Sequence, residues 1–170
     1  MFLTTAPPQT LSGGFMNGQL SFQIGDKVVY PNHGVGIIEQ ISSRTIGPTV
    51  QKFYLLTIKA SCLKVEVPFH NVGNVGLRRV VKNGELTKIL DFLQDGKCDS
   101  NADWKDRFKE TSDKMRTGSL LEVAIVLKSL LVLASTKALS FREKKMLDRA
   151  RYLLVTELAM ARNTEETEIE

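Results

Sequence analysis

Residues 22–36 carry the sequence FQIGDKVVYPNHGVG, which combines a strand pattern with a tight turn. Residues 27–30 are rich in valine and tyrosine, residue types that favour β-strands. Pro31, Asn32 and Gly34 follow directly and are typical turn residues, while the closely spaced Gly34 and Gly36 suit a bent strand or a bulge. We therefore predict two short strands here, joined by a turn.

The same strand-rich composition continues to residue 75. We predict strands at residues 27–30, 34–42, 51–59 and 62–68, with a further turn signal at Gly47 and Pro48. For a segment as short as residues 22–75 we expect a strongly bent antiparallel sheet that closes into a small barrel, because closure removes exposed strand edges. A Tudor-like or SH3-like β-barrel is the expected N-terminal fold.

After Gly84 the apolar residues recur with helical spacing, which predicts helices at residues 85–94, 101–115, 120–134 and 141–161. Three capping boxes mark helix starts, namely Ser100 with Asp103, Ser119 with Glu122, and Ser140 with Glu143. One buried stripe of the last helix is predicted to hold Met146, Leu147, Ala150, Leu153, Leu154 and Leu158. The predicted fold class is α+β with two domains, the β-barrel being followed by an all-α helical domain.

Composition and charge suggest four segments along the chain. Residues 1–20 are rich in Pro, Thr, Ser and Gly and are predicted to be a disordered tail, with Met1 and Met16 as alternative starts. The barrel is assigned to residues 21–76, the helical domain to 77–162 and an acidic tail to 163–170. Residues 1–76 have net charge +2, residues 77–151 have +6, and the remainder has −4. A basic middle is expected of a nucleic-acid contact, although ordinary solvated helices show similar excesses.

Several classes of protein are disfavoured. The longest apolar-rich stretch, residues 120–134, is interrupted by Glu122 and Lys128, whereas a membrane span needs about 20 apolar residues. No secretory signal is recognisable, so the cytoplasm is the expected location. Cys62 and Cys98 form no C-x-x-C pair and are predicted to be two free thiols, so we expect no metal and no cofactor. Nucleotide-binding and catalytic motifs are missing from the sequence, which disfavours an enzyme and a small-molecule substrate.

Trp104 is the single tryptophan and lies near the start of a polar helix. Phe108 is four residues on, so both could be core residues on one face. Alternatively, Trp104 is partly exposed beside Lys105, Arg107 and Lys109, where an aromatic ring can stack on bases while the cations meet phosphates. Composition alone leaves these interpretations even.

Two further basic clusters have equally open interpretations. Lys144 and Lys145 lie on the polar side of the last predicted helix, where a solubilising face is the commoner role. Arg78 and Arg79 lie at the junction between the domains and could be linker charge. Neither cluster identifies a partner by itself.

Five motifs together resemble a known family. They are residues 22–36, Val67-Pro68, Val75-Gly76-Leu77-Arg78, residues 104–109 and residues 139–147. In order and spacing they resemble the CarD and CdnL proteins over residues 22–162. The opening motif also resembles the polymerase-binding module of the transcription-repair coupling factor, but the short chain and the missing ATPase motifs exclude that enzyme.

The resemblance implies that the barrel binds the β subunit of RNA polymerase. Arg44 matches a polymerase-contacting arginine, and Thr45 is its neighbour in the same segment. Where some members carry a second such arginine, before the Val-Pro pair, this chain has Glu66, and Lys64 is a candidate to compensate. The resemblance thus implies a polymerase-binding set of Arg44, Thr45, Lys64 and Glu66.

The resemblance also implies that the helical domain touches promoter DNA at the upstream edge of the bubble, without base-specific readout. Trp104 matches a tryptophan that wedges into the minor groove, while Lys109 and Lys144 match DNA-contacting lysines. Asp106 replaces a basic residue of some members, so phosphate contacts near Trp104 are expected to be fewer. The implied DNA-binding set is Trp104, Lys105, Arg107, Lys109, Lys144 and Lys145. A monomer that stabilises the open complex is expected.

Two alternatives remain open at this point. A protein-only adaptor would bind a partner strand at the edge of the sheet and leave no DNA footprint. A general nucleic-acid binder would bind free DNA or RNA tightly, with a steep dependence on salt.

Overall fold

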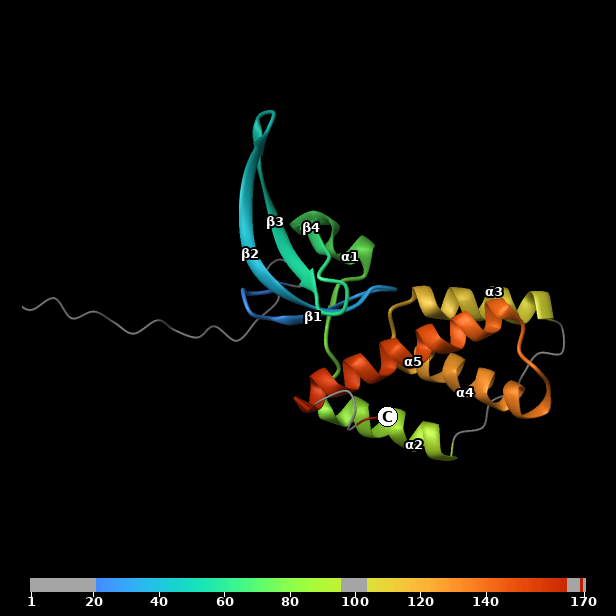
Figure 1. The fold of residues 1–170 in the computed structure, drawn as a ribbon. Helices are drawn as coiled ribbons and strands as arrows, with labels where there is room; N and C mark the ends of the chain where they lie inside the picture. The colour runs from blue at the N-terminus through green and yellow to red at the C-terminus, as the bar shows by residue number, and fades with distance from the viewer. Residues whose placement is uncertain (1–20, 96–103, 165–168, 170) are drawn as a thin grey trace, which may run out of the picture.

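The computed structural model describes residues 21–95, 104–164 and 169, excluding the side chains of residues 104–107. Within these residues a five-stranded antiparallel sheet is followed by a group of helices, as Figure 1 shows. The strands are β1 (Lys27–Tyr30), β2 (Gly34–Ile46), β3 (Thr49–Ile58), β4 (Lys64–Pro68) and β5 (Arg78–Arg79). The predicted division into a β part and a helical part is confirmed. The predicted disordered tail, 1–20, lies outside the described residues.

The sheet has the strand order β4-β3-β2-β1-β5. β2 and β3 form a long curved hairpin that projects away from the helices in Figure 1. A register shift between Ile38 and Gln40 makes Glu39 an extra residue in β2, and such a bulge bends its strand. The described ladders end at β4 and β5, so Tudor-like or SH3-like closure stays a prediction.

Aromatic rings organise the core of the sheet. Tyr54 is buried, its ring stacks on Phe69 with centroids 4.0 Å apart, and its hydroxyl accepts a hydrogen bond from the Phe22 amide at 3.1 Å. Phe22 also meets the Tyr54 ring edge-on, with centroids 5.5 Å apart. The first residue of the opening motif is therefore a core residue, which explains why the ordered strand pattern begins there.

Short elements connect the sheet to the helices. A 3₁₀ turn, η1 (Phe69–Asn71), and a single helical turn, α1 (Val72–Val75), precede β5, and the sequence pattern predicted none of the three. Leu77 is buried in the core of the sheet, and β5 pairs with β1. By packing and pairing, residues 77–79 therefore lie with the sheet, although the division at residue 76 assigned them to the helical domain.

The helices are α2 (Asn83–Asp95), α3 (Trp104–Arg116), α4 (Leu120–Thr136) and α5 (Phe141–Arg162). The predicted stripe of α5 is confirmed: Ala150, Leu153, Leu154 and Leu158 are buried in the helical core, and Met146 and Leu147 pack against it.

The three predicted capping boxes have different outcomes. At α5 the Glu143 carboxylate accepts from the Ser140 amide at 2.8 Å, and the Ser140 hydroxyl accepts from the Glu143 amide at 3.3 Å, so this box is confirmed. The box at Ser119 is wrong, because its hydroxyl makes no capping bond to α4. The pair Ser100 and Asp103 lies outside the described residues.

Candidate functional site

The four residues assigned to polymerase binding lie on two strands separated by β3. Arg44 and Thr45 are on β2, while Lys64 and Glu66 are on β4. The Arg44 guanidinium lies 5.5 Å above the Phe53 ring of β3, and its Nη2 donates to Glu66 Oε1 at 2.6 Å. The alternation of side chains along a strand produces this arrangement, because Arg44, Phe53 and Glu66 lie on one face of the sheet.

Lys64 is paired as well. Its ammonium lies 3.3 Å from the carboxylate of Glu39, the extra residue of the β2 bulge. The Thr57 hydroxyl and the Lys64 ammonium beside it hold the pKa of the Glu39 carboxyl below its ordinary value. Sequence reasoning missed Glu39, because a bulge that turns a side chain toward the next strand leaves no clear sequence pattern.

The charges of this surface, which we call the β2–β4 patch (Glu39, Arg44, Lys64 and Glu66), cancel in two pairs. All four side chains remain substantially exposed, with Arg44 at 57% and Glu66 at 38%. Lys64 thus has an acidic neighbour of its own, Glu39, and its role in place of a second arginine stays a prediction. A partner must compete with these internal pairs for either cation.

The predicted DNA-binding residues are divided between two helices. Trp104, Lys105 and Arg107 lie in the first turns of α3, and their side chains are outside the described residues. Phe108 is half-buried, which fits either interpretation of Trp104, and Lys109 is exposed. The structure does not distinguish between the two interpretations of Trp104.

Lys144 and Lys145 are exposed in the first turn and a half of α5. The Lys145 ammonium lies 4.7 Å from the centroid of the Phe141 ring, which is 72% exposed, the highest value among the large apolar side chains of the described residues. Sequence reasoning missed Phe141. Its position directly after the Ser140 cap, outside the apolar stripe of α5, was the available signal.

These two helix starts share one end of the molecule. In Figure 1, α3 and α5 both begin at the end of the helical unit that lies away from the sheet. The later part of α5 contacts the sheet, since Lys27 Nζ donates to Asn163 Oδ1 at 3.2 Å. The starts of α3 and α5, near which Lys109, Lys144 and Lys145 lie, are thus away from the sheet that carries the β2–β4 patch.

The described part of the chain carries no sign of a metal centre or a membrane span. No three metal-ligating side chains come together there, and Cys62 is an exposed thiol, while Cys98 is not described. None of the described helices is long and apolar enough to cross a membrane.

Comparison with known proteins shows similarity along nearly the whole chain. The family model of the CarD-like/TRCF RID domain matches residues 22–81, and that of the CarD, C-terminal domain matches residues 88–170. The chain is 36% identical over 148 residues to "Putative transcription factor YdeB" of Bacillus subtilis (strain 168), an alignment that covers 87% of this chain and 97% of that protein. These similarities support a role in transcription. Since both halves match in order and the relative aligns over nearly its full length, the chain belongs to the CarD family of transcription regulators.

Proposed function

We propose that this chain stabilises promoter open complexes by binding the RNA polymerase β subunit with its sheet and promoter DNA with its helices. The observation that carries the proposal is the separation of two exposed polar surfaces on one packed body. The β2–β4 patch lies on the sheet unit, which matches the CarD-like/TRCF RID domain, and exposed Lys109, Lys144 and Lys145 lie on the helical unit.

The β2–β4 patch suits a protein partner better than nucleic acid. Arg44 presents a planar guanidinium above the Phe53 ring, so a partner can be met by charge-assisted hydrogen bonds and by apolar contact together. Because its formal charges cancel, this surface has no excess of cations to attract a phosphate backbone. Thr45, next to Arg44 on β2, is exposed but lies on the opposite face of the sheet.

The starts of α3 and α5 suit DNA. Lys109, Lys144 and Lys145 are exposed and can neutralise phosphates, and the open Phe141 ring beside Lys145 offers an apolar surface for sugar or base. Trp104 is the proposed wedge at the bubble edge. A wedge that binds only the partly melted duplex shifts the equilibrium by its differential affinity, and about 1.4 kcal/mol changes the open-to-closed ratio tenfold.

The lifetime of the open complex on a ribosomal RNA promoter, measured with polymerase from the same bacterium, tests the proposal. Wild type should lengthen it, Trp104→Ala should lose the lengthening while retaining polymerase binding, and Trp104→Phe should restore part of it. Arg44→Glu should lose polymerase binding, whereas Lys88→Glu, an equivalent change of net charge on exposed α2, should not. If Trp104→Ala still lengthens the lifetime of the open complex, Trp104 is a core residue and not the wedge. No lengthening by wild type would overturn the proposed function.

A protein-only adaptor is the second candidate. β4 ends the sheet order, so its outer edge is available for addition of a partner strand. This role predicts polymerase or other protein binding with no change in open-complex lifetime and no DNA footprint.

A further inference from the structure

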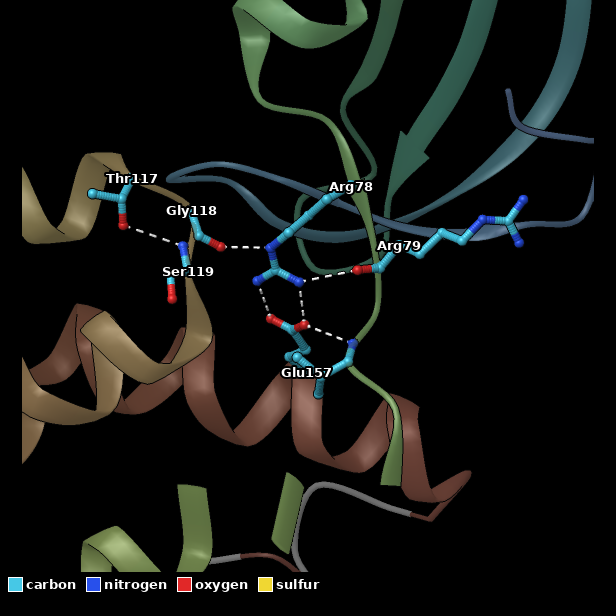
Figure 2. Close-up of polar contacts among 7 residues, drawn as sticks. Arg78, Arg79, Thr117, Gly118, Ser119 and Glu157 are labelled. Atoms are coloured by element: carbon cyan, nitrogen blue, oxygen red, sulfur yellow. Dashed lines mark hydrogen bonds and ion pairs between the residues drawn. The ribbon is translucent and has the colours of Figure 1, made fainter. Parts of the chain in front are cut away.

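A partly buried arginine–glutamate pair joins the sheet to the helices, as Figure 2 shows, with the Arg78 side chain 25% exposed. Arg78 Nη1 and Nη2 donate to the two carboxylate oxygens of Glu157 at 2.6 and 2.8 Å. The Glu157 side chain is 3% exposed and also accepts from the Val81 amide at 3.1 Å. Arg78 Nε donates to the Gly118 carbonyl at 2.6 Å, and Nη1 donates to the Arg79 carbonyl at 3.1 Å. One guanidinium therefore connects β5, α5 and the segment between α3 and α4.

Close backbone contacts surround the pair. Gly76 and Gly118 both have positive φ, and a Cβ built on either would lie 3.1 or 3.0 Å from Pro31 Cγ, so the proline in the β1–β2 turn packs against both glycines. A Cβ on Gly34 would lie 3.4 Å from the Tyr152 hydroxyl of α5. A cavity at this joint, lined by residues of both units, holds about 20 Å³, enough for a single water at most. The sheet and helices are thus packed together.

In so closely packed a contact between sheet and helices, an ion pair is less usual than apolar side chains. Burying two charges costs desolvation energy, and a well-packed apolar pair of similar volume often gives equal or greater stability. Arg78 and Glu157 add a constraint on the relative orientation of the sheet and the helices. A bidentate pair with further hydrogen bonds is satisfied only in a narrow range of geometries. The pair therefore restricts how the two units are oriented beyond what apolar packing would require.

We propose that Arg78 and Glu157 are positioning residues that hold the polymerase-binding and DNA-binding surfaces at one fixed relative orientation. The inference rests on the proposed function, because orientation matters only when both surfaces engage at once. A protein that binds two sites together gains affinity from its rigid connection, and the gain is lost when the geometry no longer matches. Neither residue has to touch polymerase or DNA.

The double variant Arg78→Met with Glu157→Leu tests the inference, with Arg79→Met as a matched control. Arg79 is the next residue, and it pairs at 3.1 Å with Asp26 within the sheet unit. We expect the double variant to fold and to bind polymerase alone as wild type does, but to bind the polymerase–promoter complex about tenfold more weakly. Residual dipolar couplings should fit one alignment tensor for both units in wild type and in the control, and should require two in the double variant.

Each result has a defined meaning. A single tensor in the double variant, or an undiminished affinity for the polymerase–promoter complex, would overturn the inference. A double variant that fails to fold would also overturn it, since the pair would then maintain the fold rather than the orientation. Glu157→Gln keeps the shape of the side chain. It should reduce the affinity for the polymerase–promoter complex in the same direction as the double variant, but by a smaller factor. If wild type does not lengthen open-complex lifetime, the proposed function fails, while the dipolar couplings still decide whether the pair fixes the orientation.

Discussion

Glu66→Gln is predicted to strengthen binding to the polymerase β subunit, because it releases Arg44 from an internal partner. In the structure Arg44 Nη2 lies 2.6 Å from Glu66 Oε1, with the two side chains 57% and 38% exposed. A carboxylate of the partner has to displace Glu66 before it can use that guanidinium fully. An exposed pair contributes about 0.2–1 kcal/mol, which converts to a gain in affinity of about 1.4- to 5-fold.

Fluorescence anisotropy with a labelled chain and purified β subunit can resolve this difference at low salt. The gain should shrink as salt is raised, since exposed pairs are screened. Glu85→Gln is the matched control, because it makes the same change of charge at an exposed position of α2. Unchanged or weaker binding by Glu66→Gln would refute the reasoning. An equal gain from Glu85→Gln would refute it too, by assigning the effect to net charge.

Three further predictions concern the fold. Ser140→Ala should lower the free energy of unfolding in urea by about 1 kcal/mol through loss of the capping box, and Ser119→Ala should cost less, because its hydroxyl makes no capping bond; equal losses would contradict this difference. Gly118→Ala should cost more than the ~1–2 kcal/mol expected from its φ of +74° alone, because its Cβ would lie 3.0 Å from Pro31 Cγ, and a loss of stability no larger than this would argue against the packing described at the joint. Carbon-detected NMR titration should give Glu39 a pKa below the ordinary value of about 4.3, and Lys64→Met should raise it. Because the folded-state pKa is lowered, the stabilisation from Glu39 is present above its unfolded pKa and disappears as the pH falls through the folded one, so the stability difference between Lys64→Met and wild type should vanish in acid.

The structure also changes how the polymerase-binding residues are understood. From the sequence, Glu66 stands where some family members have an arginine, and Lys64 was a candidate to compensate for it. The observed pairs, Arg44 with Glu66 and Lys64 with Glu39, make both cations internally satisfied. If polymerase binds through this surface as proposed, its carboxylates will compete with these exposed pairs, and affinity should be sensitive to salt and to the charge at Glu66.

Local sequence patterns were sufficient for the individual elements. A composition rich in Val, Ile, Phe and Tyr between turn residues predicted the four main strands, the helical spacing of apolar residues predicted four helices, and the box at Ser140 marked the start of α5. These features are short-range, since each depends on residues a few positions apart. The predicted ends of β2 and β3 were less accurate. β2 continues to Ile46, four residues beyond its predicted end, because pairing with β3 extends the ladder through polar residues.

Long-range contacts were decided by the tertiary structure alone. Arg78 was open to interpretation as linker charge, yet its partner Glu157 lies 79 positions later in the chain, on α5. Glu157 follows Leu153 by four residues and Leu154 by three, so helical spacing places it on the buried stripe of α5, but no local pattern identifies its partner. The sequence by itself determined the four longer strands and the four longer helices, since their patterns are local, but not η1, α1 and β5. Which charges pair, and how the two units are joined, depended on the packing of segments that are distant in sequence.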